Sequence, residues 1–275
     1  MFSVASSDRI FARVKEVLDR RKSVEVVSPV IAAVQGRSSS VPLTRTAIGV
    51  DANVFLRIAS HASSADLIDY LNGRHTAPVV LPGQAIQEFW NNQLHAVKTY
   101  ADEVDEALTK LDRVLDKIDD NFNDFRANLQ RELSEFRSSH GHVYSEATVR
   151  KTVSFLELIQ SRAQVPYVPR QQFWEIAQIR QHTKTPPGFM DKGFGDFFVW
   201  ADFLAGVQMA KSGSTDFELA VLITNDVKKD WSRAGLAHPI LVAECQALLG
   251  VPFETWNLEQ FASRVASDGQ CQAPP

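Results

Sequence analysis

Cysteine and long hydrophobic runs are both scarce in this sequence of 275 residues. Its two cysteines, Cys245 and Cys271, are too few for a disulfide framework or for the ligand set of a structural zinc site. Apolar runs such as residues 219–224 are far shorter than the roughly 18–20 residues that a membrane-spanning helix needs. We therefore expect reduced thiols and no segment that crosses a membrane.

The N-terminal residues show no secretory signal. Charged side chains interrupt every apolar stretch of residues 8–16, so the uncharged hydrophobic core of such a signal is missing. On this basis we expect a cytoplasmic protein. Hydrophobic residues make up 44% of the chain and charged residues 23%, which is typical of folded globular proteins and argues against disorder.

The chain also lacks an excess of positive charge, since its formal net charge is −4. A protein that coats nucleic acid through bulk electrostatics is therefore excluded, although a nuclease is not. The negative charge is concentrated, because residues 101–137 hold 11 acidic and 6 basic side chains. The excess of acids in that segment is larger than the net negative charge of the whole chain.

Short apolar runs alternate with segments of helical length along most of the chain. We expect strands at residues 47–50, 78–81, 219–224, 239–242 and 252–256, and helices at residues 8–20, 52–58, 63–71 and from residue 83 onward. Alternating strands and helices imply a parallel sheet that is covered by helices on both faces. The expected fold is therefore α/β, with a three-layer parallel sheet of the Rossmann-like kind.

The same pattern divides the chain into five parts. A stretch rich in loop-forming residues, 35–44, marks a boundary before the first strand. The expected parts are an N-terminal helix and linker (1–45), the first half of the sheet domain (46–100), a helical insertion (101–183), the second half (184–265) and a disordered tail (266–275).

Apolar residues recur in a heptad pattern through the expected insertion. Their steps of four and three connect Val104, Leu108, Leu111, Leu115, Ile118, Phe122, Phe125 and Leu129. Continued to Phe136, this helix would be about 50 Å long at the usual rise per residue. Because the apolar seam needs a covering partner, we expect residues 147–160 to fold back as the second arm of a helical hairpin. A homodimer or a partner protein bound along residues 104–136 is the alternative.

Two carboxylates follow predicted strands that lie far apart in the sequence. Asp51 comes directly after residues 47–50, and Asp226 follows residues 219–224. The carboxyl ends of parallel strands share one edge of a sheet, where ligands bind, so both acids are expected there. Either acid alone could cap a helix. Two neighbouring carboxylates, however, repel each other unless a cation lies between them, and oxygen ligands favour Mg²⁺ or Mn²⁺.

Two further acids can join this pair. Glu88 lies in the helix expected after the second strand, and Asp196 follows Gly193-Phe-Gly at the start of an unusually apolar helix. Taken alone, a glutamate on a helix is normally solvated surface, and an acid in a first turn is stabilised by the helix dipole. Their place in a site therefore depends on a pattern that includes all four acids.

In this order and setting the four acids resemble the active-site pattern of PIN domains. Gly49-Val-Asp-Ala-Asn-Val-Phe-Leu is similar to the opening strand of that family, where an acid is followed two residues later by a small polar residue. Glu88, Gly195-Asp196 and Leu222-Ile-Thr-Asn-Asp226 resemble its second, third and fourth acids. The stretch Pro186-Pro-Gly-Phe-Met-Asp-Lys-Gly-Phe-Gly-Asp resembles the larger bacterial PIN-like proteins. The resemblance covers residues 46–95 and 184–260.

The resemblance implies a PIN-like fold and a metal-dependent nuclease that hydrolyses phosphodiester bonds of RNA or single-stranded nucleic acid, with RNA favoured. It implies that Asp51, Glu88, Asp196 and Asp226 hold Mg²⁺ or Mn²⁺ and are catalytic. Asn53 and Thr224 would orient waters or ligands around them, and Asp230 is an auxiliary candidate. The candidates for substrate binding are the nearby cations Lys184, Lys192 and Lys228.

Two other interpretations compete with a PIN-like nuclease, and the biological context of the nuclease is a separate question. A haloacid-dehalogenase-like phosphatase also begins with a strand-terminal Asp, but it needs a second Asp where this chain has Asn53. A catalytically silent PIN-like scaffold that acts through its helical arm would have no need for four acids. A toxin or defence role is also open, although toxin-type PIN domains are compact and this chain carries a long segment between its second and third acids.

Overall fold

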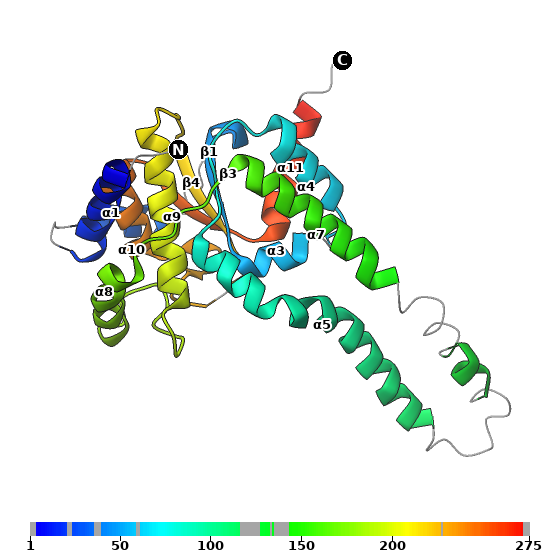
Figure 1. Cartoon of the computed structure of the whole chain (residues 1–275). Helices are drawn as coiled ribbons and strands as arrows, with labels where there is room; N and C mark the ends of the chain where they lie inside the picture. The colour runs from blue at the N-terminus through cyan, green and yellow to red at the C-terminus, as the bar shows by residue number, and fades with distance from the viewer. Residues whose placement is uncertain are drawn as a thin grey trace.

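A five-stranded parallel sheet forms the centre of the protein (Figure 1). The computed structural model describes residues 4–20, 24–35, 40–58, 61–115, 127–132, 134, 143–226 and 228–271. The strand order is β3-β2-β1-β4-β7, and all neighbouring pairs are parallel. The strands are β1 (Thr46–Val50), β2 (Val79–Val80), β3 (Ala163–Gln164), β4 (Leu219–Ile223) and β7 (Phe253–Trp256). The predicted α/β class with a parallel sheet is confirmed.

The direction in which strands are added reverses between β1 and β4. From β1 the chain builds outward through β2 and β3, and it then places β4 on the other side of β1, with β7 beyond it. Val50 at the end of β1 pairs with Ile223 at the end of β4, so the residues after both strands emerge at the same level. In open parallel sheets a ligand crevice forms at such a reversal.

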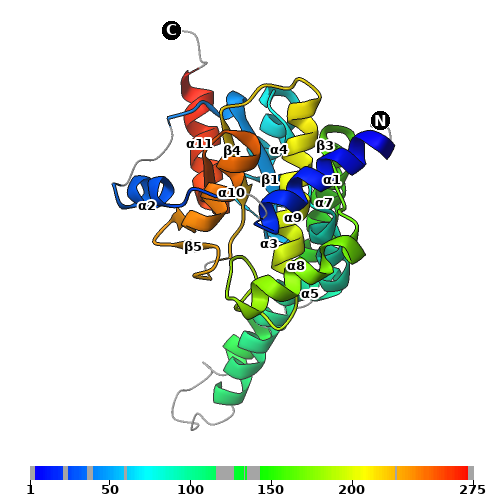
Figure 2. The same cartoon turned by 90° about the vertical axis from the view of Figure 1, so that its left-hand side faces the viewer.

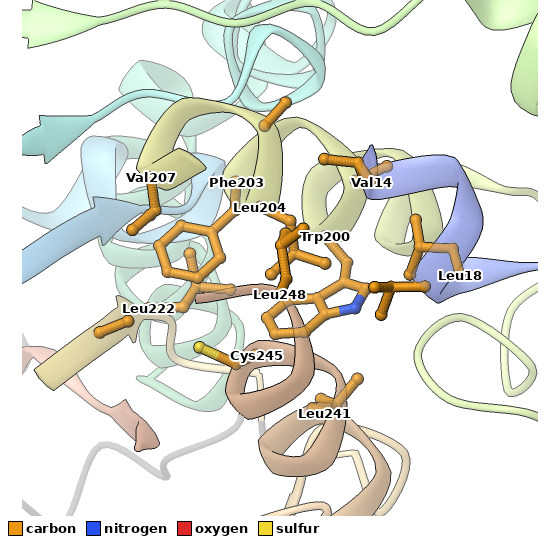
Figure 3. Close-up of a cluster of buried hydrophobic side chains, with 14 of the residues drawn as sticks. Val14, Leu18, Trp200, Phe203, Leu204, Val207, Leu222, Leu241, Cys245 and Leu248 are labelled. Atoms are coloured by element: carbon orange, nitrogen blue, oxygen red, sulfur yellow. The ribbon is translucent and has the colours of Figure 1, made fainter. Parts of the chain in front are cut away.

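One face of the sheet is covered by α1 (Val4–Leu18), α8 (Arg170–His182), α9 (Gly195–Ser212) and α10 (Pro239–Leu249). α9 is central to this layer, and its Trp200 and Phe203 are fully buried. Figure 3 shows Phe203 close to Leu222 of β4, and Trp200 between α1 and α10. The predicted N-terminal helix therefore buries its apolar stripe, since α1 packs across α9 and α10 (Figure 2).

The opposite face is covered by α3 (Ala52–Ile58), α4 (Ser64–Asp69), the π-helical turn η2 (Tyr70–Arg74), the start of α5 (Gly83–Leu115), the end of α7 (Val143–Arg162) and α11 (Leu258–Cys271). Phe55 of α3 joins two of these helices, because its ring lies 5.7 Å from that of Phe89 in α5 and 4.9 Å from that of Phe155 in α7. A short 3-10 helix, η1 (Leu43–Arg45), leads into β1. The predicted three-layer arrangement is thus confirmed.

α5 and α7 extend from the body as a pair of helices that contact each other (Figure 1). The pair has the form of the predicted helical hairpin, but Leu111 of the heptad seam is 37% exposed, so that α7 covers the seam stays a prediction. The heptad positions from Val104 to Leu115 lie in α5, and Leu129 lies in a helical segment at residues 127–132. The heptad residues outside the described part of the chain are Ile118, Phe122 and Phe125, and Phe136 is outside it as well. A homodimer or a partner protein at the arm remains a prediction.

The strand predicted at residues 239–242 is wrong, because these residues begin helix α10. The side chain of His238 accepts a hydrogen bond from the backbone N–H of Ile240 and so caps the helix, and Pro239 occupies a first-turn position that suits its missing N–H. A short apolar run fits a buried helix as well as a strand. The helix continues to Leu249, and Gly250 follows it with a φ of 70°.

Several short elements were not predicted. β3 has only two residues and lies at the edge of the sheet, where its backbone pairs with β2 without an apolar pattern of its own. Helix α2 (Val27–Val34) lies in the segment expected to be a linker and packs on α10. A two-stranded antiparallel ribbon pairs β5 (Ser232–Arg233) with β6 (Leu236–Ala237).

The C-terminal helix corrects another expectation. α11 continues to Cys271, so the tail predicted to be disordered from residue 266 is helical as far as the described residues extend.

None of the described helices combines the length and hydrophobicity needed to cross a bilayer.

Candidate active site

Asp51 lies directly after β1, at the edge of the sheet where β1 and β4 end, and it is 7% exposed. Its Oδ1 accepts a hydrogen bond from the backbone N–H of Ala52 at 2.6 Å. Its Oδ2 accepts from the hydroxyl of Thr224 at 2.7 Å and from Nδ2 of Asn53 at 2.8 Å. Three donors from two strand ends therefore hold this carboxylate in one orientation.

Asn53 and Thr224 also connect the residues after β1 with those after β4. The hydroxyl oxygen of Thr224 accepts hydrogen bonds from the backbone N–H of Asp226 at 3.0 Å and from Nδ2 of Asn53 at 3.2 Å. Oδ1 of Asn53 accepts from the backbone N–H of Asn225 at 2.9 Å. The two residues thus fix the position of Asp226 relative to Asp51. That they orient waters or ligands stays a prediction.

Glu88 reaches the same region from α5. Its Oε1 accepts a hydrogen bond from Nε2 of Gln84 at 3.0 Å. The same oxygen lies against the backbone of Gly195, because a methyl group placed on Gly195 would be 2.5 Å from it. The start of α9 can approach Glu88 this closely only because residue 195 has no side chain.

Asp196 lies in the first turn of α9 and is held from the side of the β4 connection. Its Oδ2 accepts a hydrogen bond from the indole N–H of Trp231 at 3.0 Å. Nζ of Lys228 lies 3.2 Å from the same oxygen. The start of α9 therefore brings Asp196 to the residues that follow β4, while Gly195 meets Glu88.

Lys228 lies among three carboxylates. Its Nζ is 2.7 Å from Oδ2 of Asp191, 2.8 Å from Oδ2 of Asp226 and 3.2 Å from Oδ2 of Asp196. Asp191 was not among the predicted site residues. Its only signal in the sequence is its place in the Pro186–Asp196 stretch, which resembles the larger bacterial PIN-like proteins. The structure therefore brings together five acids and one lysine.

Burial and mutual repulsion make Asp51 and Glu88 weaker acids. Burial raises the pKa of Asp51, hydrogen bonds from Thr224 and Ala52 oppose the shift, and the charge of Asp226 adds to it. Burial also raises the pKa of Glu88, and the charges of Asp51 and Asp191 act in the same direction. Both carboxylates would gain from a neighbouring cation.

The acids around Lys228 differ in pKa. Burial raises the pKa of Asp196 to about 7, and the charge of Lys228 opposes this rise. The hydrogen bond with Asp191 and the negative charge of Asp191 add to it. Burial acts against the charge of Asp191, but hydrogen bonds with Lys228 and Asp196 outweigh it and lower its pKa. Burial likewise opposes the charge of Lys228, but its carboxylate partners raise its pKa overall. The lysine therefore stays charged and partly neutralises the cluster.

The remaining predicted residues lie around this cluster rather than within it. Asp230 is buried, and its Oδ2 accepts hydrogen bonds from the backbone N–H groups of Gly188 and Met190 at 3.0 and 3.3 Å, so it supports the loop that carries Asp191. Lys184 and Lys192 are exposed near the two ends of that loop. Among the three predicted cations, Lys228 is the one that contacts the acids.

The donor chemistry of the cluster fits a hard divalent cation. Carboxylate oxygens are the ligands that Mg²⁺ and Mn²⁺ prefer. Burial raises the pKa values of Asp51, Glu88 and Asp196, and a bound cation would favour their charged forms. Within the described residues, no three acidic, histidine or cysteine side chains are grouped closely enough to hold one ion together. The ammonium group of Lys228 instead lies between three of the acids.

Comparison with known proteins gives one match. A family model described as a PIN like domain matches residues 105–239. The matched range includes Asp191, Asp196, Asp226 and Lys228, as well as much of the helical arm, while Asp51 and Glu88 precede it. Neither a curated protein nor a solved structure matches the chain.

Proposed function

Because the chain belongs to the PIN-like domain family, we propose that it is a metal-dependent endonuclease that hydrolyses phosphodiester bonds of RNA or other single-stranded nucleic acid. The proposed catalytic residues are Asp51, Glu88, Asp196 and Asp226. RNA is the favoured substrate. The proposal joins a family-level expectation of nuclease chemistry with the particular acids of this chain.

One observation carries the proposal. Acids from β1, from α5, from α9 and from the loop after β4 converge at the reversal of strand order, although a fold has no structural need for such a group. Burying several carboxylates together costs free energy, which the raised pKa values of Asp51 and Glu88 reflect. Clusters of this kind occur where a function requires them.

Asp51, Glu88, Asp196 and Asp226 would hold Mg²⁺ or Mn²⁺, directly or through water. When bound, such an ion neutralises charge on the phosphate and lowers the pKa of a bound water. Asn53 and Thr224 keep the Asp51 carboxylate in place, so its orientation does not depend on the ion. We propose Asp230 as an auxiliary residue that acts through the loop it supports.

The cations divide into two groups in this proposal. Lys184 and Lys192 are exposed and would bind substrate phosphates beside the cluster. Lys228 contacts three acids and would reach a phosphate from within the cluster. Its displacement from one or more of these carboxylates would leave them free to serve as ligands.

The direct test replaces Asp51 by Asn and measures cleavage of labelled single-stranded RNA and DNA with Mn²⁺ or Mg²⁺, and with EDTA. We expect a loss of at least about 100-fold, as is usual when one electrostatic catalytic group is removed, without a change in fold by circular dichroism. Asp66→Asn, on the exposed side of α4, is the matched control. Normal cleavage by Asp51→Asn would show that the site is wrongly assigned.

A toxin or defence role is a further part of the proposal. Production of the active protein in growing cells should then slow growth, whereas production of Asp51→Asn should not. Equal growth with both proteins would contradict a toxic role and leave the nuclease proposal to the cleavage test.

A catalytically silent scaffold that acts through the helical arm is the second candidate. It is favoured by the position of Lys228, which already supplies a positive charge to Asp191, Asp196 and Asp226. Titration of the protein with Mn²⁺ in a calorimeter separates the two candidates. A nuclease should bind the ion and lose that binding in Asp51→Asn, whereas a silent scaffold should show no heat that depends on the carboxylates.

A further inference from the structure

Trp174 in α8 is a large aromatic residue whose exposure the packing of the protein does not explain. Three of the five tryptophans, Trp200, Trp231 and Trp256, are at most 3% exposed, whereas Trp174 is 48% exposed. Its ring is nevertheless fixed, because it packs edge-on against Phe194, with 4.8 Å between the ring centroids and 85° between the planes. An indole in a defined orientation therefore faces solvent.

Trp174 is connected with the acid cluster through Phe194. Phe194 precedes Gly195, which contacts Glu88, and Asp196 follows. A second contact from α8 supports the same loop, since Nε2 of Gln181 donates a hydrogen bond to the backbone carbonyl of Asp191 at 3.0 Å. α8 therefore contacts the loop that presents Asp191 and Asp196 at two points, and it places the exposed indole against Phe194, two residues before Asp196.

The loop that α8 contacts bears both an apolar and a cationic side chain at the surface. Met190, which is 49% exposed, lies on the same loop as the exposed side chain of Lys192. Proteins that bind single strands combine aromatic rings, on which bases stack, with cations that follow the phosphates. Bases within a duplex already stack on their neighbours, so an exposed indole selects a base that is unpaired.

We propose that Trp174, held against Phe194, is a stacking site for an unpaired nucleobase of the strand whose phosphate lies at the acid cluster. This inference rests on the proposed nuclease function and assigns that site a contact with the substrate base. It separates the roles of the residues, because Lys192 contacts phosphates and Trp174 contacts a base. Trp174 is a binding residue and takes no part in the hydrolysis.

Binding can be measured without cleavage in the Asp51→Asn background with EDTA. The probes are a fluorescein-labelled single-stranded 12-residue RNA of mixed sequence, the corresponding abasic strand and the corresponding duplex. Trp174→Ala should weaken binding of the RNA by about 5- to 150-fold, which corresponds to ~1–3 kcal/mol for one stacked base. Binding of the abasic strand should change little, and Trp174→Phe should restore most of the affinity for the RNA.

Trp90→Ala is the matched control, because Trp90 is 71% exposed on α5 and the same side chain is removed. It should leave the affinity for the RNA close to that of the parent protein. In the active enzyme, Trp174→Ala should raise KM and leave kcat nearly unchanged, since the acids are not altered. Tighter binding of the duplex than of the single strand would overturn the inference.

The test also separates the inference from the proposed function. If the active enzyme cleaves RNA but Trp174→Ala neither raises KM nor weakens binding, the stacking site is wrong and the nuclease proposal stands. An equal loss of affinity for the RNA and the abasic strand would also overturn the stacking site. If the parent protein neither binds nor cleaves any of the probes, both proposals fail together.

Discussion

At the scale of single residues, the main feature of the site is the unequal state of its carboxylates. Asp51 is fixed by donors from both strand ends, whereas Asp196 shares its surroundings with Asp191 and Lys228. Two acids and a lysine in contact titrate together, so their protonation belongs to the group. The charge at this edge of the sheet therefore depends on pH and on the three groups together.

The pKa of Asp196 predicts how this charge affects stability. Its value of about 7 in the folded protein lies above the ordinary 3.8, so the folded state binds the extra proton. The contribution of this proton to the free energy of unfolding is fully present below about pH 4 and is lost as the pH rises through about 7. In EDTA, Asp196→Asn should therefore raise the melting temperature more at pH 8 than at pH 5.5.

Thermal melts at the two pH values test this prediction, with Asp66→Asn as a control that should shift the curves little. The raised pKa values of Asp51 and Glu88 act in the same direction and remain in the variant. The dependence of the melting temperature on pH should therefore weaken in Asp196→Asn without disappearing. An Asp196→Asn protein with the same gain at both pH values would contradict the assignment.

At the scale of elements, the site depends on how closely α5 and α9 approach each other. The contact is between Glu88 and Gly195, where a methyl group would lie 2.5 Å from a carboxylate oxygen. Gly193, in the turn that leads to α9, has nothing within 4 Å of a methyl group in the same position. A methyl group should therefore displace Glu88 at residue 195 and meet no neighbour at residue 193, although the two glycines are close together in the sequence.

Gly195→Ala should reduce nuclease activity by about 10- to 100-fold, because a displacement of about 1 Å in an active site can cost this much. The melting temperature should change little, since alanine favours a helix and Glu88 can move toward solvent. Cleavage rates and melting curves of Gly195→Ala and Gly193→Ala provide the comparison. The prediction fails if both variants cleave like the parent protein.

At the scale of the whole molecule, a buried ion pair connects the helices of one face. Nη1 and Nη2 of Arg180 donate to the Glu244 carboxylate, at 2.8 and 3.1 Å, and both residues are buried. Trp200 donates to the same carboxylate at 2.9 Å, and Arg180 also donates to the backbone carbonyl of Leu18. α1, α8, α9 and α10 therefore share one polar network inside the apolar layer.

Arg180→Met should destabilise the protein by about 3–5 kcal/mol, because it leaves the Glu244 carboxylate buried without its main partner. The contact of Arg20 with Glu244 at 3.1 Å keeps the loss toward the lower end. Arg45→Met removes an exposed pair with Glu218 and should cost less than about 1 kcal/mol. Urea unfolding of the two variants measures the difference, and equal losses would contradict the role of the network.

The sequence alone identified the features that depend on local pattern. Asp51 and Asp226 were predicted because each follows an apolar run, and parallel strands bring such ends to one edge. The sheet, the helical hairpin and the helix α9 were predicted from alternation, heptad spacing and hydrophobicity. The strand predicted at residues 239–242 was wrong, because a short apolar run does not by itself distinguish a buried helix from a strand.

Only the tertiary structure decided which residues meet. Asp191 joins the cluster because Asp230 supports its loop and Lys228 reaches it from the loop after β4, and neither contact leaves a periodic signal in the sequence. The pairing of Trp174 with Phe194 and that of Glu88 with Gly195 likewise connect separate elements. Local sequence determines where strands and helices form, whereas contacts between distant side chains depend on how those elements pack.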